Sequence, residues 1–181
     1  MPIAVNGSGT ITGISVGGLP DGIVDADMLA ANAVTAGKLA SGILQAKCTA
    51  ANSLGQISST SDSYADVTGL DVVITPKFSN STMILVTTFH VTTAYANRNA
   101  SVRLTFNHSG ISQSSVDSNQ DGYSINSEAG SFDGFGAMCY THTPSTTNEI
   151  TYRLQFRNVG ANSTVYFNRK PSKIIAYEVA A

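Results

Sequence analysis

The chain has 181 residues, a formal net charge of −2, 12% charged side chains and 42% hydrophobic ones. This length and hydrophobic content provide for one ordinary domain with a packed core and a short extra segment, and they argue against global disorder. The sparse charge excludes a coiled coil or helical bundle, which needs abundant Glu and Lys, and it offers no basic character that would attract nucleic acid. The polar surface must come instead from 22 Ser, 19 Thr and 13 Asn.

The first 44 residues differ in texture from the rest of the chain. They are rich in Gly, Ala and Asp, whereas all seven Phe and all seven Tyr lie after them. A segment of this length without aromatic side chains can hardly build a core of its own. We therefore expect an extended N-terminal attachment and trimerisation arm over residues 1–44 and a separate domain over residues 45–181. The apolar side chains expected to anchor the arm against symmetry mates or other proteins are Ile11, Ile14, Val16, Val24, Leu29, Val34 and Leu39.

A short internal repeat lies within this arm. Residues 24–31 and 34–41 share the pattern Val-x-Ala-x-x-Leu-Ala at a shift of ten positions. Asp25 and Thr35 stand where an N-cap would open a helical turn. The repeat predicts one or two short helices, which neighbouring segments must stabilise because so short a helix is not stable alone.

The second region is expected to be entirely β. Its β-branched and aromatic residues alternate with polar ones in short runs that Gly, Pro and Asn interrupt, and this pattern is typical of a sandwich or jelly roll. The expected strands cover residues 43–50, 64–75, 83–93, 101–106, 135–140, 150–156, 163–167 and 173–179.

Two groups of motifs resemble a known family. The Gly-rich segment 9–22, with the Val-x-Ala-x-x-Leu-Ala repeats after it, resembles the N-terminal segments of tailed-phage tail fibres and related virion appendages. The β-rich head domain at the ends of such proteins is similar to the pattern Asp66-Val67-Thr68-Gly69-Leu70 together with segments 74–76, 84–86, 165–169 and 174–179. The resemblance implies a homotrimeric structural protein of a bacteriophage virion, without catalytic residues.

The function that this resemblance implies is assembly. A tail fibre or short appendage would attach to other virion proteins by its arm and present the β-domain outward, where it could recognise a host receptor or glycan. The alternative is a capsid decoration (cement) protein that stabilises the head. An enzyme is not expected, because no persuasive acidic pair stands out. Membrane insertion is not expected either, because no apolar run approaches the ~20 residues that span a bilayer.

One segment matches the pattern of a calcium-binding loop, DxNxDG-x5-E. Its candidate ligands are Asp117, Asn119, Asp121, the carbonyl of Tyr123, and Glu128. Ser124 stands where such loops usually carry a packed aliphatic residue, and neither flank is expected to be helical. A solvated loop of turn-forming residues is therefore favoured over a structural metal site, and no cofactor is predicted.

Other side chains with chemical potential are expected to serve packing or assembly. Cys48 and Cys139 are predicted to be two buried free thiols rather than a disulfide, and His90 is predicted to be packed within its strand. Aromatic residues expected in or beside loops, for glycan or protein recognition or for packing, are Tyr95, Tyr123, Phe132 and Phe135.

Basic residues gather near the C-terminus. Arg153 alternates with apolar neighbours, so its side chain is expected to point away from the core. Ordinary strand and turn charges are the favoured interpretation. The functional alternative is an interface patch that pairs with acidic residues of a neighbouring copy, with Asp117, Asp121, Glu128 and Asp133 as candidate complements.

Overall fold

A computed structural model describes residues 4–5, 11–12, 42–51, 55–93, 98–117, 122–127, 130–160, 164–167 and 171–180. The chain divides into two compact units, Met1–Leu39 and Ala40–Ala181. In the first unit, β1 (Ala4–Val5) pairs antiparallel with β2 (Ile11–Thr12). The short helices expected from the repeat fall outside the described residues. No helix among the described residues is long and apolar enough to cross a membrane.

The first sheet of the second unit has six strands, with the long β6 at its centre. β6 pairs with β10 along one side, and with β13 and then β12 along the other, all antiparallel. The outer strands β3 and β4 pair with β13 and β12. The strands of this sheet are β3 (Ile43–Ala51), β4 (Ile57–Ser59), β6 (Thr82–Thr93), β10 (Phe132–His142), β12 (Val165–Phe167) and β13 (Ser172–Val179).

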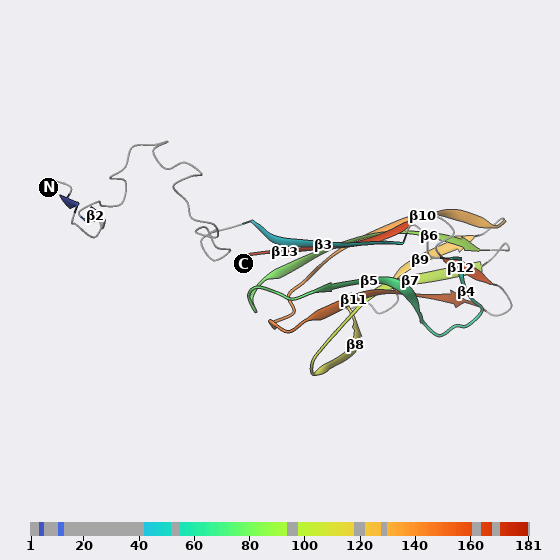
Figure 1. The fold of residues 1–181 in the computed structure, drawn as a ribbon. Coiled ribbons are helices and arrows are strands. Elements are labelled where there is room, and N and C mark those ends of the chain that lie inside the picture. Colours follow the sequence, from blue (N-terminus) through green and yellow to red (C-terminus); the bar gives the residue numbers. More distant parts are fainter. Residues whose placement is uncertain are drawn as a thin grey trace. The chain divides into compact units, whose positions relative to one another are not determined.

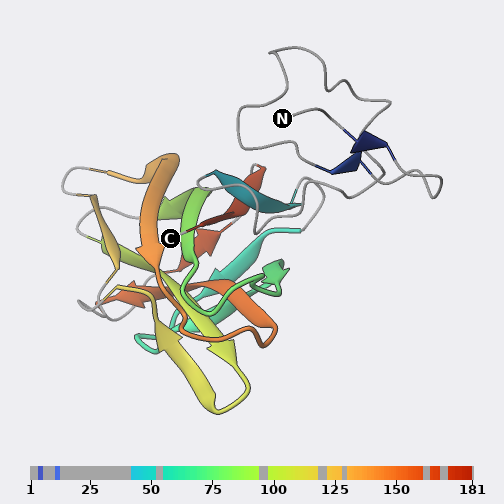
Figure 2. The ribbon, with the colours of Figure 1, turned by 90° about the vertical axis from the view of Figure 1, so that its left-hand side faces the viewer.

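The second sheet has five strands in the order β5-β11-β7-β8, with β9 also pairing with β7. Figure 1 shows β5, β11 and β7 in one layer and β3, β13, β6 and β10 in the other. In Figure 2 the hairpin of β7 and β8 extends away from the other strands. The strands are β5 (Ala65–Ile74), β7 (Arg98–His108), β8 (Ile111–Ser115), β9 (Tyr123–Ser127) and β11 (Ile150–Val159).

The core lies between the two sheets because apolar residues alternate along each long strand. In β6, Met83, Leu85, Phe89 and Val91 are fully buried, and in β11 the alternate positions from Ile150 are buried as well. Side chains at every second position of a strand point to the same face, so each long strand contributes one buried row to the core.

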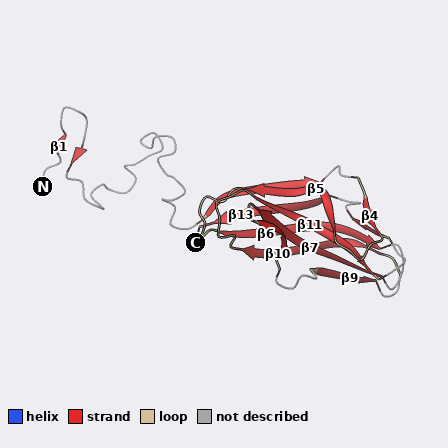
Figure 3. Cartoon of the chain, turned by 90° about the horizontal axis from the view of Figure 1, so that it is seen from below, coloured by secondary structure: helices blue, strands red, loops and turns tan. Residues whose placement is uncertain are grey.

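The expected fold class, an all-β jelly-roll-like sandwich, is confirmed. The described residues of the second unit form strands and loops, as Figure 3 shows, and each of the eight expected strands corresponds to an observed one. Within the second unit three strands were not expected: β4, β8 and β9. They are short and rich in Ser; β8 and β9 pair with the longer β7, and β4 pairs with the equally short β12.

Three of the aromatic residues expected in or beside loops belong to strands, and Phe135 was already included in the expected strand 135–140. Phe132 and Phe135 lie in β10, and Tyr123 opens β9. The Phe89 ring lies edge-on to the Tyr123 ring, with 5.9 Å between their centroids. Tyr95 lies outside the described residues.

Candidate functional site

A bulge in β5 explains the Asp66-Val67-Thr68-Gly69-Leu70 pattern. The pairing of β5 with β11 shifts register between Arg153 and Gln155, so β5 bulges opposite these residues. Gly69 has a φ of 82°, a backbone conformation that glycine adopts without the steric cost of a Cβ. The bulge buries Val67 and Leu70 completely. It also brings the carboxylates of Asp66 and Asp71 to the same arginine, as described next.

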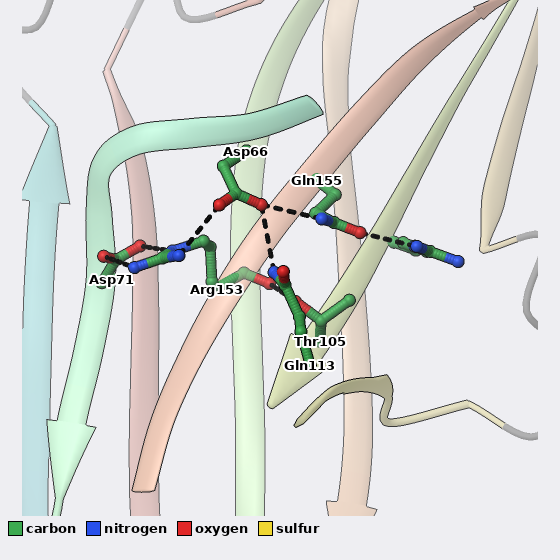
Figure 4. A network of polar contacts seen from close by, with 7 residues as sticks. Asp66, Asp71, Thr105, Gln113, Arg153 and Gln155 are labelled. Carbon is green, nitrogen blue, oxygen red and sulfur yellow. Dashed lines mark hydrogen bonds and ion pairs between the residues drawn. The ribbon is translucent and has the colours of Figure 1, made fainter. Parts of the chain in front are cut away.

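Arg153 lies between two carboxylates on the outer face of the second sheet (Figure 4). Its Nε and Nη2 donate to the two Asp71 oxygens at 2.7 and 2.6 Å, and its Nη1 donates to Asp66 Oδ2 at 2.9 Å. Hydrogen bonds to Asp71, which outweigh partial desolvation, raise the pKa of Arg153. Burial raises the pKa of Asp66, but hydrogen bonds led by Gln155 and the charge of Arg153 outweigh it, so the pKa is lowered overall.

The polar contacts continue across the same face (Figure 4). Gln155 Nε2 donates to Asp66 Oδ1 at 2.7 Å and Gln113 Nε2 donates to the same oxygen at 3.0 Å. Arg103 Nε donates to Gln155 Oε1 at 2.8 Å, and its guanidinium lies 3.8 Å from the centre of the Tyr64 ring. These side chains therefore form hydrogen bonds with one another across four neighbouring strands, β5, β11, β7 and β8.

The expectation that Arg153 points away from the core is confirmed, and the favoured interpretation of ordinary strand charges fits Arg153, while the alternative of a patch that pairs with a neighbouring copy stays a prediction. Arg153 pairs with Asp66 and Asp71 of its own chain. Asp133, one of the suggested complements, accepts a hydrogen bond from Thr92 Oγ1 at 2.6 Å and lies 2.9 Å from His90 Nε2. The strand register decides this outcome, because it places opposite charges on adjacent strands.

We expect the Arg153–Asp71 pair to stabilise the fold modestly. Both side chains are about one quarter to one third exposed, so solvent screens the pair, and a double-mutant cycle with Arg153→Met and Asp71→Asn should give a coupling free energy of about 1 kcal/mol. Urea unfolding at low salt and at about 1 M NaCl measures it, and the coupling should shrink at high salt. A coupling near zero at low salt would contradict the observed bidentate geometry.

The outer face of the first sheet has the opposite character. Cross-strand pairing aligns its outward-facing residues in rows that run across the strands. Val179 and Ile43 form one row, Ala46, Tyr177 and Ile84 form the next, and further rows follow along the strands. Ile43 and Phe135 are 60% and 59% exposed. We call this set the apolar face; its described members are Ile43, Ala46, Cys48, Ala50, Ile84, Val86, Phe135, Ala137, Cys139, Ile175, Tyr177 and Val179.

One row of the apolar face joins the two cysteines. Cys48 is the partner of Ile175, Ile175 is the partner of Val86, and Val86 is the partner of Cys139. Both thiols are free and exposed, so the expectation that they are buried was wrong. Three inter-strand steps of about 4.8 Å separate them by roughly 14 Å, twice the Cα separation that a disulfide tolerates, so they cannot pair within one chain.

Few ionisable groups lie on this face. His90 is fully buried although it lies on the outer side of β6, because the Phe135 ring covers it at 4.9 Å and Asp133 contacts its Nε2. The expectation that His90 is a packed residue is thus confirmed. Lys173 lies beside Thr88 at the same end of the face as His90.

The candidate calcium ligands are only partly described. Asp117 follows β8, and burial together with the Asp117 carboxylate raises the pKa of Tyr140. Tyr123 opens a strand rather than continuing a loop. Asn119, Asp121 and Glu128 lie outside the described residues. Within the described part of the chain, no group of three or more His, Cys, Asp or Glu side chains could hold a metal ion.

Of the residues expected to anchor the arm, Ile11 lies in β2, paired with Val5. The others fall outside the described residues, namely Ile14, Val16, Val24, Leu29, Val34 and Leu39. Their role therefore stays a prediction.

No family model matches the chain, and no curated protein matches it. Among solved structures, an Eiger TNF from S. frugiperda has 14% identity and a TM-score of 0.41, over 73% of this chain and 90% of that one. The VP2 protein of infectious bursal disease virus has 11% identity and a TM-score of 0.43, over 74% of this chain and 36% of that one.

At such identities the likeness concerns the fold alone. The neighbours include proteins of viral particles, among them a second infectious bursal disease virus structure at 13% identity with a TM-score of 0.42, covering 76% of this chain and 37% of that one. None of the structures named here is a tail fibre, so the resemblance to that family stays a prediction.

Proposed function

We propose that the chain is a structural protein of a virus particle and acts by assembly rather than by catalysis. More specifically, we propose that the chain is a homotrimeric tail fibre or short appendage of a bacteriophage, located in the virion. It attaches through its N-terminal arm and presents the β-domain outward. The observation that carries the proposal is the apolar face, because a broad sheet surface that is apolar over most of its rows, with Lys173 near one end, is suited to a protein partner.

The outer face of the second sheet supports the same proposal. Its two neighbouring carboxylates, Asp66 and Asp71, both bind Arg153. A glycosidase needs one carboxylic acid with a raised pKa, whereas the pKa of Asp66 is lowered. This face is suited to solvent exposure, and the β7–β8 hairpin, with Ile111 41% exposed beside its turn, would face a host receptor or glycan.

Solution mass tests the proposed assembly. Size exclusion with light scattering on the full chain should give about 56 kDa for three chains of 18.8 kDa each. A mass of 18.8 kDa at every concentration would overturn the proposal of an obligate trimer.

The alternative is a capsid decoration protein, for which the same apolar face would dock on the head. Antibodies against the β-domain, applied to purified particles and viewed by electron microscopy, separate the two roles. Label on the tail supports the appendage, whereas label over the head supports decoration.

A further inference from the structure

We propose that the apolar face of β3, β13, β6 and β10 is the surface through which copies of this chain bind one another, with the row of Cys48, Ile175, Val86 and Cys139 near its centre. This inference rests on the proposed assembly function and names the surface and the partner. The partners are further copies of the chain, and in the proposed trimer the three copies turn this face toward their common three-fold axis.

The distribution of charge favours a second copy as the partner. The three rows that contain Val179, Tyr177 and Val86 consist of apolar residues, Thr82 and Thr141. The ionisable side chains in these three rows are the Tyr177 phenol and the two thiols. Two identical surfaces that carry a net charge repel each other, whereas two neutral apolar surfaces do not. A partner recognised by charge would find nothing to pair with in these rows.

The two outer sheet faces differ in the free energy of burying them in an interface, and this difference favours the apolar face. The second sheet carries the Arg153, Asp66 and Gln155 network, whose groups are already hydrogen-bonded and partly solvated. Burying that network in an interface would remove water without forming new pairs, which costs free energy. Burying Ile43 and Phe135, the two most exposed large apolar side chains among the described residues, removes apolar surface from water instead.

The size of the apolar face fits a stable interface. Four strands at roughly 4.8 Å each, and eight residues along a strand, give a flat area of about 19 by 27 Å. This flat area of about 500 Å² is roughly two thirds of the 800 Å² or so that one partner contributes to a standard interface, before the relief of the side chains is counted.

A matched pair of substitutions tests the proposal on the full chain. Val86 in β6 and Val73 in β5 both point outward from a sheet, one on the apolar face and one on the polar face. Val86→Asp should convert the assembly to an 18.8 kDa monomer in light scattering, while Val73→Asp should leave the mass unchanged. Circular dichroism and thermal melting establish that both variants remain folded.

Thiol reactivity gives a second, independent measurement. In the assembled wild-type chain, alkylation of Cys48 and Cys139 should be slower than in the Val86→Asp monomer by more than about tenfold, because the interface covers both thiols. If Val86→Asp fails to fold, the wild-type chain diluted until it dissociates replaces it as the reference.

The outcomes separate this inference from the proposed function. An assembly in which Val86→Asp changes nothing and both thiols react freely would overturn the interface and leave the assembly function standing. A wild-type chain that is monomeric at all concentrations would overturn both. Protected thiols in such a monomer would assign the apolar face to another segment of the same chain.

Discussion

Replacing Glu178 by Gln is expected to lower the free energy of unfolding at pH 7 by about 2–3 kcal/mol, because it removes a buried charged acceptor from several donors. Glu178 is fully buried in β13. Its Oε1 accepts from the Lys77 amide at 2.6 Å and from the Phe78 amide at 3.4 Å, and its Oε2 accepts from Gln45 Nε2 at 2.6 Å. The carboxylate thereby joins β3 and β13 to the turn that follows β5.

This loss should depend on pH. Burial raises the pKa of Glu178, but hydrogen bonds led by those from Ser81 and Gln45 outweigh burial and lower it below its ordinary value of 4.5. A carboxyl group with a lowered folded-state pKa stabilises the fold above its unfolded-state pKa and loses this effect as the pH falls through the folded-state value. The stability difference between wild type and Glu178→Gln should therefore narrow as the pH falls below about 4.5.

Urea unfolding between pH 7 and pH 3 would measure the effect, with Glu149→Gln as the matched control because Glu149 is exposed. The control should cost less than about 0.5 kcal/mol at pH 7. If Glu178→Gln cost no more than this control, Glu178 would not hold the turn after β5.

Replacing Gly122 by Ala should be more damaging, with a loss of more than about 3 kcal/mol, because strain and a steric clash combine. Gly122 has a φ of 63° just before β9, and a Cβ there would lie 2.2 Å from the Val102 carbonyl oxygen. Since that contact is with backbone, β7 or β9 would have to move. Gly122 thus allows the chain to approach β7 closely as it enters β9.

The Gly110→Ala variant measures the cost of backbone strain in the absence of a steric clash. Gly110 has a φ of 90° in the β7–β8 turn, but a Cβ there would meet nothing within 4 Å. This variant should lose about 1 kcal/mol from backbone conformation alone. Urea unfolding of both variants compares them, and equal losses would show that β9 does not approach β7 closely at Gly122.

The strands that could be predicted from the sequence are those whose pattern is strong over many residues. β6 and β11 show buried alternate positions over their length, and such alternation depends only on the local period of a strand. β8 and β9 escaped prediction because Ile111–Ser115 and Tyr123–Ser127 are short and polar. Their stability comes from pairing with β7 and, for β9, from burial of Ile125.

The sequence by itself determined the all-β class, the sparse charge and the outward direction of Arg153, since these depend on composition and on alternation within single strands. The tertiary structure alone decided which residues share a row. Register placed Cys48 and Cys139 on one exposed line, and the bulge at Gly69 brought Asp66 and Asp71 to Arg153. The physical reason is that alternation is local, whereas cross-strand neighbours are set by pairing between segments far apart in the chain.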